Sequence, residues 1–135
     1  MYSTIGQKLY EIINALEPTT KIAAVYNYDK KEFDAFPSVI ISPSDQTENI
    51  FDTRDNESVY KFIVRVVDLN KNVSSMEARM REICDDILET LRKNQFLDNT
   101  VHRTTLSVRW GWASQDVELR VCEIVVESAV LNPTV

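Results

Sequence analysis

Residues 73–94 read VSSMEARMREICDDILETLRKN and carry the strongest helix pattern in the chain. The apolar side chains recur at steps of three and four residues, which places them on one stripe of a helix. They are Met76, Met80, Ile83, Cys84, Ile87, Leu88 and Leu91. We expect Ser74 and Glu77 to form a capping box at the start, and Asn94 to end the helix. The opposite face is charged, so this helix needs an apolar surface on one side and water on the other.

The composition indicates one globular domain, residues 1–135, with a single core. A net charge of −6 argues against a protein that coats DNA non-specifically. No apolar run approaches the ~20 residues of a membrane span, and the first residues lack the pattern of a signal peptide. We therefore expect no membrane partner. For Cys84 and Cys122, buried free thiols are favoured over a disulfide.

Shorter elements are expected before this helix. An N-terminal helix with a capping box from Thr4 to Gln7 buries the stripe formed by Ile5, Leu9, Ile12, Ile13 and Leu16, and Pro18 ends it. Short strands are expected at residues 21–28 and 36–42. The polar residues 44–57 predict an extended arm that turns at residues 53–56.

Three long strands are expected at residues 58–68, 103–112 and 118–131, followed by a loose tail at residues 131–135. Phe96 and Leu97 are expected to anchor the connection after the central helix. The order of elements predicts an α+β fold, a mainly antiparallel sheet with two helices packed on one face.

The second face of this sheet mixes apolar and charged residues. Ile63 and Val125 lie among charges that would pair across the strands: Lys61, Arg65 and Arg109 with Glu123 and Glu127. A neighbouring subunit is the economical cover for such a face, so we expect Ile63 and Val125 to lie in or beside a subunit interface. The alternative is an open face with scattered valines.

Two further segments have two interpretations each. Trp110 and Trp112 share a strand face, where they either pack in the core or anchor an interface. Asp52, Arg54 and Asp55 are either an ordinary hairpin tip or a charged projection that docks on a neighbour.

No catalytic, metal-binding or cofactor-binding residues are predicted. His102 is the one histidine, the two cysteines lack a zinc spacing, and the two glycines form no phosphate-binding loop. An acidic line on the central helix is better explained as a solvated face than as a cation site; its members are Glu82, Asp86 and Glu89. We expect a protein that is not an enzyme.

The order of features resembles that of the tail terminator, or tail completion, proteins of long-tailed bacteriophages. The resemblance rests on an N-terminal helix (IGQKLYEIINAL), then FPSVIIS, then a polar arm and long strand (NIFDTRDNESVYKFIVRVVD). The helix SSMEARMREICDDILETLRKN, the strand TTLSVRWGWA and a last long strand complete it. It covers most of the chain, and related neck and minor tail proteins share much of the pattern.

This resemblance implies a structural virion protein of the tail and neck, assembled in the host cytoplasm. It implies a homohexameric ring that caps the tail tube, stops its polymerisation and joins it to the head-completion or connector protein. DNA would pass through the ring without sequence-specific binding. The alternative is a small ligand-binding or regulatory domain with a pocket around Tyr60, Trp110 and Trp112.

Overall fold

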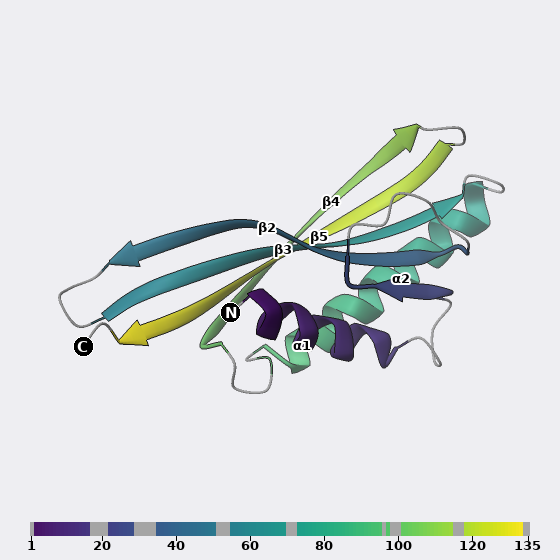
Figure 1. Ribbon diagram of the computed structural model, residues 1–135. Coiled ribbons are helices and arrows are strands. Elements are labelled where there is room, and N and C mark those ends of the chain that lie inside the picture. Colours follow the sequence, from purple (N-terminus) through teal and green to yellow (C-terminus); the bar gives the residue numbers. More distant parts are fainter. Residues whose placement is uncertain are drawn as a thin grey trace.

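The computed structural model describes residues 2–16, 22–28, 35–50, 55–69, 73–95, 97, 101–114 and 118–133. Their elements follow the order α1 (Tyr2–Asn14), β1 (Ala24–Tyr26), β2 (Ser38–Ile50), β3 (Asp55–Leu69), α2 (Val73–Lys93), β4 (Arg103–Ser114) and β5 (Glu118–Pro133). The strands form one sheet in the order β1-β2-β3-β5-β4, as Figure 1 shows. Only the β1–β2 pairing is parallel among these strands. The predicted α+β fold is confirmed.

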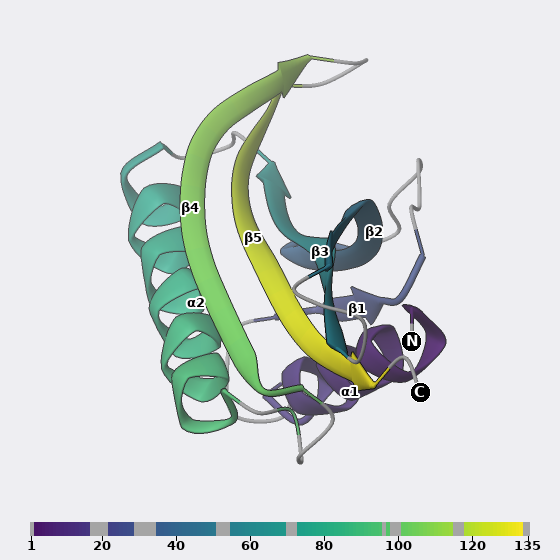
Figure 2. The same ribbon diagram turned by 90° about the vertical axis from the view of Figure 1, so that its left-hand side faces the viewer.

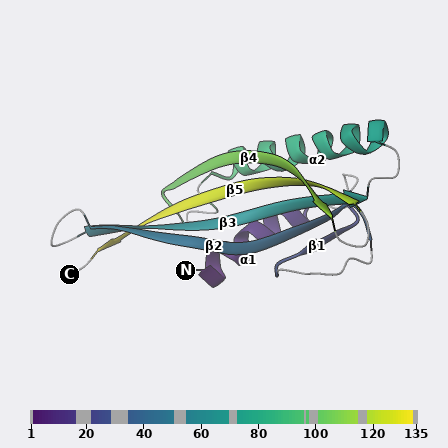
Figure 3. The same ribbon diagram turned by 90° about the horizontal axis from the view of Figure 1, so that it is seen from above.

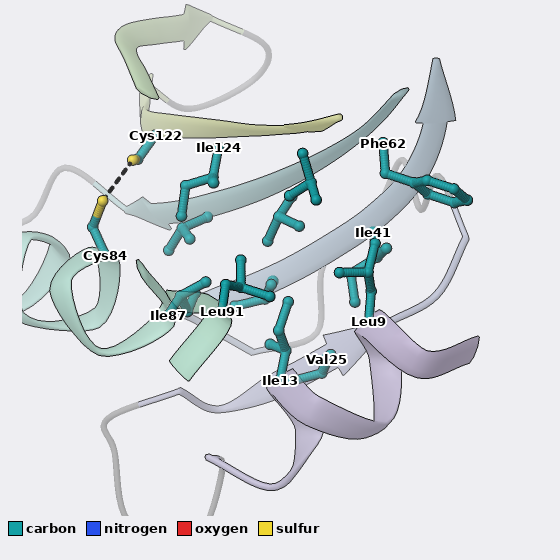
Figure 4. Close-up of a cluster of buried hydrophobic side chains, with 14 of the residues drawn as sticks. Leu9, Ile13, Val25, Ile41, Phe62, Cys84, Ile87, Leu91, Cys122 and Ile124 are labelled. Atoms are coloured by element: carbon teal, nitrogen blue, oxygen red, sulfur yellow. Dashed lines mark hydrogen bonds between the residues drawn. The ribbon is translucent and has the colours of Figure 1, made fainter. Parts of the chain in front are cut away.

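Both helices cover the same face of the sheet (Figures 1 and 3). The apolar stripe of α2 meets that of α1 and the inward side chains of β2, β3 and β5 in one core. The fully buried members contributed by α2 include Met76, Met80, Ile83, Ile87 and Leu91. Figure 4 shows part of this core, with Ile87 and Leu91 of α2 facing the sheet. The helix pattern of residues 73–94 therefore predicted the main packing surface correctly.

The helix ends differ in detail from the sequence-based expectation. Tyr2 rather than Thr4 begins α1, and α2 begins at Val73. The carboxylate of Glu77, which we expected in a capping box, accepts a hydrogen bond from Arg120 of β5. After α2, Leu97 is fully buried as expected, whereas Phe96 lies outside the described residues.

The predicted arm at residues 44–57 is mostly paired strand. The second strand of the sheet continues to Ile50, and β3 already begins at Asp55. The predicted loose tail is also wrong for residues 131–133, because β5 extends to Pro133, which pairs with Asp55. These three strand ends project past the helices as one three-stranded extension (Figure 1). The backbone hydrogen bonds between paired strands do not require apolar side chains. The polar sequence therefore gave no sign that these residues form strands.

The face without helices has a smaller apolar cluster of its own. Its buried members are Ile40, Val67, Leu119 and Val121. They lie close to the end of the sheet where β4 ends and β5 begins. Figure 2 shows β4 and β5 as long bowed strands beside α2. The twist and bow let neighbouring side chains on this face close over one another.

Candidate interaction surfaces

The face of the sheet that lacks helices carries a ladder of ion pairs. In the strand register, Lys61 lies opposite Glu127 and Arg65 opposite Glu123. The charged atoms are 3.6 Å apart in the first pair and 3.8 Å in the second. From the other side, Arg109 of β4 comes within 3.4 Å of Glu123. The cross-strand charge pairing expected from the sequence is confirmed.

Two apolar residues, Ile63 and Val125, sit opposite one another between these ion pairs. Ile63 is half-buried, but Val125 is only 8% exposed within the single chain. The aliphatic stems of the flanking lysine, arginine and glutamate side chains can cover such residues while their charges stay in water. A neighbouring subunit is therefore not needed to shield Val125, although the interface role of both residues stays a prediction. A charge placed at Val125 would disturb the fold as well as any assembly.

Glu123 is the shared partner in the ladder, which makes it the informative position for substitution. We expect Glu123→Lys to lower the free energy of unfolding by about 1 kcal/mol, because two favourable cross-strand pairs become repulsive. Denaturant unfolding followed by circular dichroism measures this. Asp85→Lys, at an exposed residue of α2, makes the same charge change and serves as the control. Equal unfolding free energies for the two variants would show that the ladder contributes nothing to stability.

The second surface is the tryptophan end, defined here as Trp110 and Trp112 of β4 with Arg120 of β5. Both tryptophans are exposed, at 39% and 46%, so the core-packing interpretation is wrong. The guanidinium carbon of Arg120 lies 5.2 Å from the centre of the Trp110 ring and 4.9 Å from that of Trp112. Arg120 also donates to Glu77 of α2 and, over 3.0 Å, to the carbonyl oxygen of Gly111. This arginine holds the two rings and α2 in a fixed arrangement.

A groove of about 630 Å³ runs beside the tryptophan end, between α2 and β4. Leu88, Val108 and Trp110 give it apolar walls, and Cys84 lines it as well. In the part of the chain that the structure describes, Tyr60 and the tryptophans do not share the expected pocket, because Tyr60 lies opposite Ser128 and Trp110 opposite Cys122, six positions apart along β5. Tyr60 instead packs against Tyr2, with ring centres 4.9 Å apart, and does not line the groove.

The third surface is the three-stranded extension. Asp52 and Arg54 lie outside the described residues, and only the backbone of Asp55 is described, as the first residue of β3. Their predicted contact with a neighbour stays a prediction. The register places this extension at the opposite end of the sheet from the tryptophan end, because Asp55 pairs with Pro133 while Asp68 pairs with Arg120. The structure therefore separates the candidate residues into three places instead of joining them in one site.

Sequence reasoning missed two buried carboxylates. Asp68, only 1% exposed, accepts a hydrogen bond of 2.8 Å from Nε of Arg79 and so ties β3 to α2. Glu57, 7% exposed, pairs with Arg103 at 2.9 Å and with His102 at 3.1 Å. An acidic residue at the end of an apolar strand was the available signal for Asp68. Both buried carboxylates therefore have basic partners on another element.

Among the described residues, no group of three or more His, Cys, Asp or Glu side chains is placed to hold a metal ion. None of the described helices is long and apolar enough to cross a membrane. No protein-family model matches the chain, and no curated protein matches its sequence.

Proposed function

We propose that this chain is a self-assembling structural subunit that acts as a tail terminator of a long-tailed bacteriophage. In this role six copies form a ring that caps the tail tube, ends its growth and joins it to the head-completion protein. The proposal makes the protein a non-enzymatic component of the virion tail and neck.

The observation that carries the proposal is the placement of two different features, the exposed tryptophan end and the three-stranded extension, at opposite ends of one sheet. The tryptophan end and the three-stranded extension are separated by most of the length of β3. At ~3.3 Å per residue this separation is about 40 Å. A subunit that meets one neighbour through one surface and the next neighbour through another makes head-to-tail contacts, which close into a ring when the rotation allows.

Charge supports the same role. Each chain carries a net charge of −6, so a ring of six would be strongly acidic. DNA that must slide through a channel is better served by repulsion than by a basic surface that neutralises its phosphates and holds it.

A second candidate function is supported by the groove beside Trp110. Its volume of about 630 Å³ lies within the range of small-molecule sites. The groove is open, and both of its arginines, Arg120 and Arg81, already pair with Glu77. A metabolite that raises the melting temperature of a monomer or dimer would favour this alternative.

The proposed function is tested by measuring the mass of the assembled protein and by imaging it with electron microscopy. Light scattering after size-exclusion chromatography should give about six subunits, and negatively stained particles should show six-fold rings. Added to polymerising tail tube protein from the same source, the protein should limit tube length and sit at one tube end. If the protein remains monomeric at high concentration and leaves tube growth unchanged, the proposal is contradicted.

A further inference from the structure

The two cysteines come together in the core although 38 residues separate them in sequence. Cys84 lies on α2 and Cys122 on β5, and their sulfur atoms are 3.4 Å apart (Figure 4). Both are free thiols, and the contact is a hydrogen bond donated by Cys122 to Cys84. From this geometry we propose that Cys84 and Cys122 form an oxidation site, a dithiol that small disulfides convert to an intramolecular disulfide.

The surrounding contacts hold the two chain segments beside one another. About two turns before Cys84 on α2, Glu77 pairs with Arg120, which is two residues from Cys122. Arg79 of the same helix pairs with Asp68 of β3, which lies next to Arg120 in the sheet. A disulfide bond is about 2.05 Å long, so the sulfur atoms need to approach by little more than 1 Å. Side-chain rotation within this fixed frame can supply such a movement.

A reagent can approach the two cysteines through the groove between α2 and β4. Cys84 lines this groove, whereas Cys122 is fully buried behind it. The hydrogen bond from Cys122 lowers the pKa of the Cys84 thiol, and that same bond together with burial raises the pKa of Cys122. Cys84 is only 4% exposed, but it is the thiol that lines the groove and also the one that more readily becomes the attacking thiolate.

The chemistry proceeds in two exchange steps. The thiolate of Cys84 attacks one sulfur of a small disulfide, forming a mixed disulfide and releasing the other half as a thiolate. Cys122 then loses its proton to a released thiolate, its thiolate attacks Sγ of Cys84, and the second half leaves as a thiolate. Two protein thiols are oxidised, one small disulfide is reduced to two thiols, and the two cysteine protons end on those products. The result links α2 covalently to β5 beneath the groove.

Oxidised glutathione is the probe, used on the purified full chain at mildly alkaline pH. Mass spectrometry should show a chain lighter by two hydrogen atoms, and denatured protein should have lost both titratable thiols. Closing a loop of this length should raise the melting temperature by about 10 °C, and dithiothreitol should reverse the rise. Two thiols that stay free after prolonged treatment, or disulfides only between chains, would overturn the proposal.

Single-cysteine variants separate the two roles. Cys122→Ala should stop at the mixed disulfide, giving a chain heavier by one glutathione, because the resolving thiol is gone. Cys84→Ala should gain no glutathione on the same timescale, because Cys122 has no exposed surface. Equal labelling of both variants would refute the assignment of Cys84 as the point of entry. The mass measurement on the parent chain decides whether the disulfide forms, even if a variant folds poorly. None of these outcomes depends on ring formation.

Discussion

Replacing Ile87 with alanine is expected to lower the free energy of unfolding by about 2–5 kcal/mol, since a large buried aliphatic side chain is removed. Ile87 has no exposed surface and lies in the core shared by both helices and the sheet. Figure 4 shows it on the side of α2 that faces the strands, near Leu91. The substitution removes three carbon atoms from a position where rigid strands leave little room for collapse, so a cavity should remain.

Urea unfolding followed by circular dichroism measures this change. Two neighbouring residues provide matched controls on the same helix. Leu88→Ala, at a half-buried position, should cost less than Ile87→Ala, and Glu89→Ala, at an exposed one, should stay within about 0.5 kcal/mol of the parent. A cost for Ile87→Ala no greater than that for Glu89→Ala would mean that α2 does not pack on the sheet as described.

The helical core could be predicted because it depends on side-chain periodicity alone. Burial of one stripe of α2 follows directly from apolar residues at steps of three and four, and the shared face of Lys61 and Arg65 follows from strand alternation. In each case one local pattern fixes which side chains share a face. The class of fold then follows from the order of such elements.

The ends of the strands could not be predicted from the same information. Residues 44–49 are polar, and hydrophobic patterning carries no signal about a strand without apolar residues. Their pairing with β3 depends on backbone hydrogen bonds and on the presence of the partner strand. The pairing of Pro133 with Asp55 is likewise a long-range contact that local sequence does not encode.

Burial on the second face of the sheet could not be predicted from the sequence either, because it depends on the three-dimensional arrangement. The alternation correctly put Val125 among charges, but its exposure depends on how far the stems of Lys61, Arg65 and Glu123 spread over it. Trp110 and Trp112 show the opposite case. Their alternation matches a core-facing strand, yet they lie past the apolar stripe of α2 and stay exposed. The burial of Val125 on the helix-free face and the exposure of the two rings on the edge strand β4 both depend on the three-dimensional arrangement, which local sequence does not show.

Substituting serine for both Trp110 and Trp112 is expected to raise the dissociation constant of the assembled protein by at least 100-fold. Exposed tryptophans that are held rigidly are the residues that most often dominate an interface, at about 2 kcal/mol or more each. Arg120 fixes both rings before any partner arrives, so little side-chain entropy is lost on association. Even half of the usual contribution from each ring would account for more than a tenfold change.

The same variant should keep its fold, which is what separates an interface role from a structural one. Neither ring belongs to a buried cluster, and the loss of their contacts with Arg120 should cost about 1–2 kcal/mol in total. Tyr28→Ser is the matched control, because Tyr28 is a 54% exposed aromatic residue on a different part of the surface. Analytical ultracentrifugation of the three proteins at matched concentration, with circular dichroism beside it, compares them directly. If the tryptophan variant sediments like the parent and like Tyr28→Ser, the tryptophan end is not a subunit contact, and head-to-tail assembly must use another surface.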